Sequence, residues 1–149
     1  MSSALRQLYQ DVIMEHSRNP RNVGKMDDAN AEANGNNPLC GDKISVYVKL
    51  DREIIVDAKF DARGCAISVA CASMMTEMLK GKTIQEAKGA YARFVDLLTS
   101  SDIPSIPKDE ILSSLMGVRE FPTRIKCATL PWQTLVAAID GSAKIVTTE

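Results

Sequence analysis

The stretch of sequence that decides the fold covers residues 43–60 and reads KISVYVKLDREIIVDAKF. Apolar side chains occupy every second position on both sides of a short polar segment, namely Ile44, Val46, Val48, Leu50, Ile54, Val56, Ala58 and Phe60. Alternation of this kind predicts strands with one buried face, and the polar segment 51–53 predicts a tight turn between them. The centre of the chain is therefore expected to form an antiparallel hairpin.

The segments before the hairpin predict one helix and one weak strand. Apolar residues recur with helical spacing after Ser2 and Ser3, and Asn19-Pro20 ends that pattern. His16, the single histidine, is expected to face solvent or to cap the end of this helix. Residues 27–38 alternate only weakly and finish in a loop, which predicts a poor edge strand.

Two helices are expected directly after the hairpin. The first begins at Cys65, is rich in small residues and methionines, and stops near Gly81. The second is a long surface helix, because Thr83-Ile84-Gln85-Glu86 has the spacing of a capping box and apolar residues continue with helical period to Leu98.

Two more helices are expected in the C-terminal third. Pro107 is well placed to open a short helix, and a longer one runs from near Pro122 to about Ile139. Pro131 has no N–H for the carbonyl four residues back, so a kink is predicted just beyond Cys127. The elements together predict an α+β fold in which one sheet packs against one helical layer.

Composition and charge exclude several classes of protein. With 149 residues, 45% hydrophobic and 25% charged, the chain is typical of soluble globular proteins, and we expect a single domain over residues 1–149. Eighteen basic against nineteen acidic residues argue against nucleic acid as a partner. No apolar run reaches the ~20 residues that span a bilayer, and the N-terminus lacks the apolar core of a secretory signal. A cytoplasmic protein without a membrane segment is expected.

Four cysteines in a reducing compartment are more naturally metal ligands, nucleophiles or core thiols than disulfide partners. Cys40 and Asp42 flank Gly41 where the loop enters the first clear strand, and residues two apart in extended chain face the same side. Cys65 begins a helix, where unpaired N–H groups favour a thiolate. Because a hairpin starts and ends on the same side, Cys40, Asp42 and Cys65 can converge.

A third thiol follows far along the chain at Cys127. Arg124 and Lys126 precede it and favour a thiolate by their charge, and on a helix Arg124 shares its face. Three thiolates and one carboxylate suit tetrahedral zinc or an iron-sulfur cluster. Taken singly, each cysteine is more often a core residue, and Cys71, with no cation or helix end beside it, is interpreted as core.

Three motifs, NPLCGD at 37–42, RGCAIS at 63–68 and RIKCA at 124–128, together resemble the U-type iron-sulfur assembly proteins IscU and SufU. The resemblance covers essentially the whole chain, and it implies a small antiparallel three-stranded sheet packed against a layer of about five helices. Lys126 stands where IscU proteins carry a histidine, which favours the SufU branch. Cys71 departs from the small hydroxyl residue more often found there, and the chaperone-docking motif of IscU is absent.

The resemblance implies a zinc site formed by Cys40, Asp42, Cys65 and Cys127. It also implies a pyridoxal-phosphate cysteine desulfurase of the SufS type as partner, downstream iron-sulfur assembly proteins as recipients, Cys40 as carrier of the persulfide sulfur, and Arg124 as a residue that helps to hold the partner. The function expected is that of a zinc-dependent sulfur acceptor, or sulfurtransferase. Two alternatives stay open: a scaffold that builds a labile [2Fe-2S] cluster from iron at the same site, and a structural zinc domain that serves only as a binding module.

Overall fold

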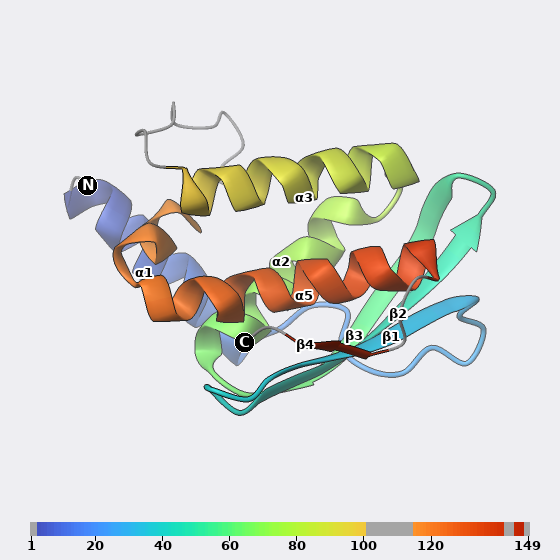
Figure 1. Ribbon diagram of the computed structural model, residues 1–149, viewed down its shortest axis with the longest axis horizontal. Helices are drawn as coiled ribbons and strands as arrows, with labels where there is room; N and C mark the ends of the chain where they lie inside the picture. Colours follow the sequence, from blue (N-terminus) through green and yellow to red (C-terminus); the bar gives the residue numbers. More distant parts are fainter. Residues whose placement is uncertain (1–2, 101–114, 142–144, 148–149) are drawn as a thin grey trace.

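The computed structural model of the chain describes residues 3–100, 115–141 and 145–147. Its elements in chain order are α1 (Ser3–Arg18), β1 (Ala31–Asn37), β2 (Asp42–Asp51), β3 (Ile54–Arg63), α2 (Ala66–Leu79), α3 (Ile84–Thr99), the 3-10 helix η1 (Leu115–Glu120), α5 (Pro122–Asp140) and β4 (Ile145–Thr147). Figure 1 shows the helices gathered over one face of the sheet, with α2 and α5 against the strands and α3 lying beyond them. The predicted arrangement of one sheet and one helical side is confirmed.

The central hairpin forms as the alternation predicts, with one local exception. β2 and β3 are antiparallel, and the inward positions of β2 and the second half of β3 are buried. The register shifts between Lys49 and Leu50, where Val56 becomes the extra residue of a β-bulge. Ile55 therefore points into the core, whereas Ile54 and Val56, expected to be buried, are exposed. One extra residue in a strand moves the side chains beyond it to the opposite face of the sheet.

The sheet has four strands in the order β3-β2-β1-β4, so the expected count of three was wrong. β1 is antiparallel to β2, and β4 pairs parallel with Asn34–Asn36 on its other side, which makes the sheet mixed. The weak strand is therefore internal, and the expectation that it lies at the edge of the sheet was wrong. A strand of three residues is too short to show a period of two, so no sequence pattern predicted β4. None of the helices in the described ranges is long and apolar enough to cross a membrane.

The core lies between the sheet and the helices α2 and α5. The small residues of α2 let it approach closely, and Met74 and Met75 fill the space around them with no exposed surface. Cys71 is fully buried in the same layer, as predicted, and burial raises the pKa of its thiol. Trp132 of α5 packs against Phe94 of α3 with ring centroids 5.3 Å apart, which fastens the outer helix to the inner one.

The helix ends agree with their sequence signals. The capping box that opens α3 is present, with Glu86 N–H donating to Thr83 Oγ1 at 3.0 Å and Thr83 N–H donating to Glu86 Oε1 at 3.1 Å. α5 begins at Pro122 and continues past Pro131 to Asp140, and the kink beyond Cys127 stays a prediction. The short helix expected after Pro107 falls mostly in residues 101–114, outside the described residues.

His16 does not face solvent, which was one of the two roles expected for it. Its Nδ1 lies 2.8 Å from Ser73 Oγ on α2, and the side chain is only 12% exposed. Ser73 Oγ also accepts the backbone N–H of Arg21 at 2.9 Å. Burial lowers the pKa of His16, which favours the neutral ring, so the histidine joins α1 to α2 as an uncharged hydrogen-bonding group.

Candidate metal centre

The loop between β1 and β2 positions the first candidate ligand. Asn37, the last residue of β1, lies opposite Asp42, the first residue of β2. The backbone N–H of Cys40 donates to the carbonyl of Asn37 at 3.2 Å, which closes a β-turn with Pro38 at its second position. Gly41, at φ +70°, then returns the chain to the strand. Cys40 is thereby held half-buried on the turn, directly before the sheet begins.

Asp42 is almost completely buried, and the start of α2 accounts for one of its oxygens. The backbone N–H of Cys65, the N-cap of α2, donates to Asp42 Oδ1 at 2.8 Å. The Cys65 Sγ lies 3.9 Å from Asp42 Oδ2. Gly64 makes this approach possible, because a Cβ at its position would lie 2.1 Å from Asp42 Oδ1 and its φ is +145°. The corner between β3 and α2 therefore fits closely around the carboxylate.

Cys127 reaches the same place from α5. It is fully buried, and its Sγ lies 3.2 Å from Cys40 Sγ. The candidate ligand atoms of Cys40, Asp42 and Cys127 all lie within 4.8 Å of one another. Cys65 stands outside this compact set but next to it, through its contact with Asp42. The structure thus brings together residues from the β1–β2 loop, the start of β2, the N-terminus of α2 and the second turn of α5.

These donors fit a zinc ion. With Zn–S bonds of about 2.3 Å, tetrahedral geometry separates sulfur ligands by roughly 3.8 Å. The two sulfurs of the compact set lie 3.2 Å apart, somewhat closer than that value, and all three ligand atoms lie within 4.8 Å of one another. Thiolates with one carboxylate are also donors that zinc accepts. Small side-chain movements are therefore enough to close the set around an ion.

The electrostatics of the thiols differ from the expectation for Cys127. The positive charges before it were expected to favour its thiolate, but burial dominates and raises the pKa of Cys127, and hydrogen bonds with Cys40 and Asp42 act in the same direction. Without a metal this thiol keeps its proton, so a metal must release that proton to bind. The guanidinium of Arg124 lies 3.7 Å from Cys40 Sγ. Its own pKa is raised by a hydrogen bond with Cys127 and by the neighbouring sulfurs.

One polar residue at the centre had no role assigned from the sequence. Asn37 is fully buried, and its Nδ2 lies 3.4 Å from Cys127 Sγ and 3.5 Å from Asp42 Oδ2. Its Oδ1 has no hydrogen-bond partner in the described part of the chain. The sequence signal for a role of Asn37 was weak, because asparagine before proline is common at the start of any turn.

Comparison with known proteins places the chain in a family. The profile of the NifU-like N-terminal domain matches residues 8–147. The chain is a NifU-like N-terminal domain. A zinc-dependent sulfurtransferase SufU from Bacillus subtilis is 45% identical over 128 residues, which is 86% of each protein. An iron-sulfur cluster assembly scaffold protein IscU from Streptococcus pyogenes is 40% identical over 141 residues, covering 95% of this chain and 88% of the relative.

Solved structures agree with this assignment. A scaffold protein of the SUF system from Fervidobacterium islandicum superimposes with a TM-score of 0.81 at 34% identity, over 90% of this chain and 98% of that structure. The expected resemblance to U-type proteins of the SufU branch is confirmed, and so is the expected α+β class.

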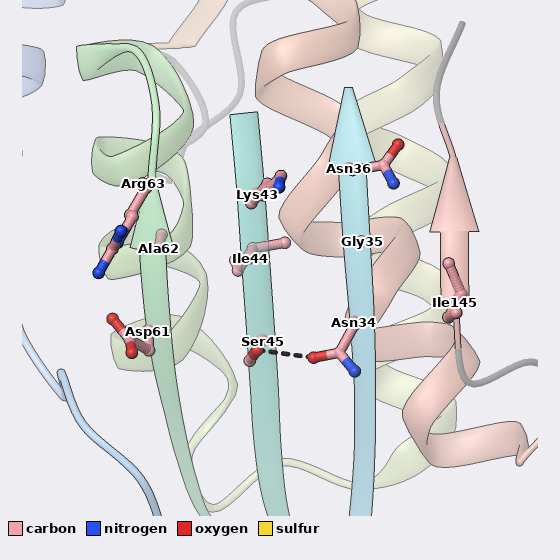
Figure 2. Close-up of a pocket in the computed structure, with 10 residues that line it drawn as sticks. All are labelled: Asn34, Gly35, Asn36, Lys43, Ile44, Ser45, Asp61, Ala62, Arg63 and Ile145. Atoms are coloured by element: carbon pink, nitrogen blue, oxygen red, sulfur yellow. Dashed lines mark hydrogen bonds between the residues drawn. The ribbon is translucent and has the colours of Figure 1, made fainter. Parts of the chain in front are cut away.

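The other face of the sheet in this NifU-like domain carries a shallow groove of about 450 Å³. Figure 2 shows its lining from β3, β2, β1 and β4, with Lys43 and Arg63 on adjacent strands and Asn34 bonded to Ser45 at 2.6 Å. Asn36 also lines the groove, so the two neighbours Asn36 and Asn37 face opposite sides of β1. The groove and the metal centre are separated by the thickness of the sheet.

Proposed function

We propose that the chain is a zinc-dependent sulfur acceptor of iron-sulfur cluster assembly that acts in the cytoplasm. In this proposal Cys40 receives sulfur from a pyridoxal-phosphate cysteine desulfurase and passes it to downstream assembly proteins. The observation that carries the proposal is the compact set of Cys40, Asp42 and Cys127 with Arg124 against Cys40. Similarity to a relative named as a zinc-dependent sulfurtransferase supports zinc and sulfur transfer.

Cys40, Asp42, Cys65 and Cys127 would hold the ion, with Cys65 drawn in from its place beside Asp42. Bound zinc supplies charge that keeps the thiols deprotonated and shields them from oxidation. This support matters most for Cys127, because burial otherwise keeps its thiol protonated.

Cys40 is the thiol best placed to react. It is half-buried on a turn, whereas Cys127 is fully buried in a helix, and its neighbour Leu39 is 78% exposed. In the transfer step, Cys40 Sγ as a thiolate attacks the outer sulfur of the desulfurase persulfide. A new S–S bond forms on Cys40, the S–S bond of the desulfurase breaks, and the desulfurase cysteine leaves as a thiolate, so no oxidant or reductant is consumed. Arg124 stabilises the attacking thiolate and offers a positive charge to the partner.

The test measures desulfurase turnover with and without the zinc-loaded protein, in the presence of a reductant and using the cognate enzyme. Stimulation is expected with the wild type and with Cys71→Ala, which removes a buried thiol that takes no part in the set. Stimulation is expected to vanish with Cys40→Ala. Full sulfur acceptance by Cys40→Ala would refute the proposal.

A cluster scaffold is the second candidate, because a relative that covers 95% of this chain carries that description. The presence of Asp42 among the candidate ligands favours this function. An oxygen ligand among thiolates would be the most weakly bound ligand of an iron-sulfur cluster and would make the cluster labile. Anaerobic reconstitution with iron and sulfide distinguishes the two functions. A [2Fe-2S] spectrum that passes to an apo-ferredoxin, with no effect on desulfurase turnover, would favour the scaffold.

A structural zinc domain would instead have inert thiols. Alkylation of Cys40 while zinc is still bound, followed by mass spectrometry, would argue against that reading.

A further inference from the structure

Asn37 contacts several of the candidate metal ligands, and no role has been assigned to it so far. Its side-chain nitrogen reaches Cys127 Sγ at 3.4 Å and Asp42 Oδ2 at 3.5 Å. Its backbone carbonyl accepts the N–H of Cys40 at 3.2 Å. One residue is therefore linked to three of the four candidate ligands, which lie on the loop, on β2 and on α5.

The chemistry of the side chain matches this position. A primary amide carries two N–H donors on one nitrogen without a positive charge, and here it faces two acceptors, a sulfur and a carboxylate oxygen. Aspartate has the same shape but no N–H, and serine or threonine has only one donor. The opposite orientation of the amide would place its oxygen against both acceptors. The donor side is therefore the one that the surroundings require.

The other end of the amide shows that this orientation has a cost. Asn37 is fully buried, and its Oδ1 has no hydrogen-bond partner among the described residues. A buried acceptor without a partner is unfavourable, and an apolar residue of similar size would avoid it. The two contacts that Nδ2 makes offset that cost only if the protein gains from holding Cys127 Sγ and Asp42 Oδ2 in fixed positions.

We propose that Asn37 is the positioning residue of the metal centre, whose amide fixes Cys127 and Asp42 by donating to both and leaves Cys40 as the ligand free to leave. Asn37 itself holds Cys40 only through the backbone, by the turn that it starts, and the Cys40 sulfur contacts Arg124 and Cys127 rather than the amide. This inference rests on the proposed function, because it assumes that the set binds zinc and that one thiolate reacts.

The test measures zinc binding by the full chain, through competition with a chromophoric chelator, for the wild type and three variants. Asn37→Ala removes both donors, and Asn37→Asp removes them while keeping the shape. Asn36→Ala is the matched control, because it makes the same change one residue away on the groove side of β1. Loss of a residue that orients metal ligands typically weakens binding about 10- to 100-fold. That loss is expected for both Asn37 variants, and less than about a threefold change is expected for Asn36→Ala.

A spectrum of the cobalt-loaded proteins separates positioning from a general loss of stability. At saturating Co²⁺, the ligand-field bands are expected to change in both Asn37 variants and to be unchanged in Asn36→Ala. Zinc affinity within about threefold of the wild type for Asn37→Asp would overturn the proposal, and so would a wild-type cobalt spectrum in both Asn37 variants. If Asn37→Ala does not fold, the isosteric Asn37→Asp still decides. A wild type that binds zinc but does not stimulate the desulfurase would contradict the proposed function, whereas the zinc affinities and cobalt spectra of the Asn37 variants would still decide whether Asn37 positions the metal ligands.

Discussion

Replacing Gly64 by alanine tests whether the corner before α2 is built around the carboxylate of Asp42. The alanine must adopt a φ of +145°, which side chains rarely take, and the strain is about 1–3 kcal/mol. Its Cβ would also lie 2.1 Å from Asp42 Oδ1 and must push the carboxylate away. The hydrogen bond from Cys65 N–H to that oxygen is then lost, which costs about a further 1.5–3 kcal/mol. The expected total is about 2.5–6 kcal/mol, a large part of the roughly 5–15 kcal/mol that stabilises a typical domain.

Urea unfolding of the metal-free protein measures this loss directly. At an m value of about 2 kcal/mol per M, the midpoint is expected to fall by about 1.25–3 M. Gly24→Ala is the matched control, because Gly24 has a φ of +125° and a Cβ there would meet nothing within 4 Å. It carries the backbone strain without the contact. If Gly64→Ala is no more destabilised than Gly24→Ala, Asp42 does not depend on the close approach and the reasoning is wrong.

Three further predictions concern the metal, a helix cap and a histidine. Asp42→Ala is expected to slow the release of zinc to a chelator, because it removes the exchangeable oxygen ligand, and unchanged stopped-flow kinetics would count against that role. Thr83→Ala breaks the capping box of α3 and is expected to lower the free energy of unfolding by about 1 kcal/mol in urea titrations, while an unchanged midpoint would show that the cap contributes nothing. Burial lowers the pKa of His16 below its ordinary value of 6.5, so the unfolded chain takes up a proton before the folded chain does. Stability should therefore fall as the pH drops from about 7.5 through 6.5 towards the folded pKa, and His16→Gln should flatten this part of the profile; a wild-type slope in that variant would assign the pH dependence to other groups.

The sequence predicted the elements whose patterns are local. The alternation at 44–60 gave the hairpin, and the spacing at 83–86 gave the start of α3 with its capping box. It could not show the bulge, because Ile54, Ile55 and Val56 are all apolar and any of them could face inward. It also missed β4, which depends on a parallel pairing with a strand more than a hundred residues earlier.

The candidate site was accessible from the sequence for a different reason. The convergence of Cys40, Asp42 and Cys65 followed from the geometry of a hairpin, and the structure places all three at one end of the sheet. The contribution of Asn37 did not follow, because burial and the direction of a side chain are set by packing between β1 and α5. For Cys127, the charge of Arg124 was visible in the sequence, but the burial that outweighs it was not.

The candidate ligands are far apart in the order of synthesis. Cys40, Asp42 and Cys65 are made early, and Cys127, on the last long helix, follows several seconds later at roughly 5–20 residues per second. A nascent chain that lacks α5 can therefore offer only a partial and open set of donors. Tight metal binding would then require that the C-terminal helix has been synthesised and has packed in place. Unfinished chains would bind metal only weakly because of the order in which the protein is made.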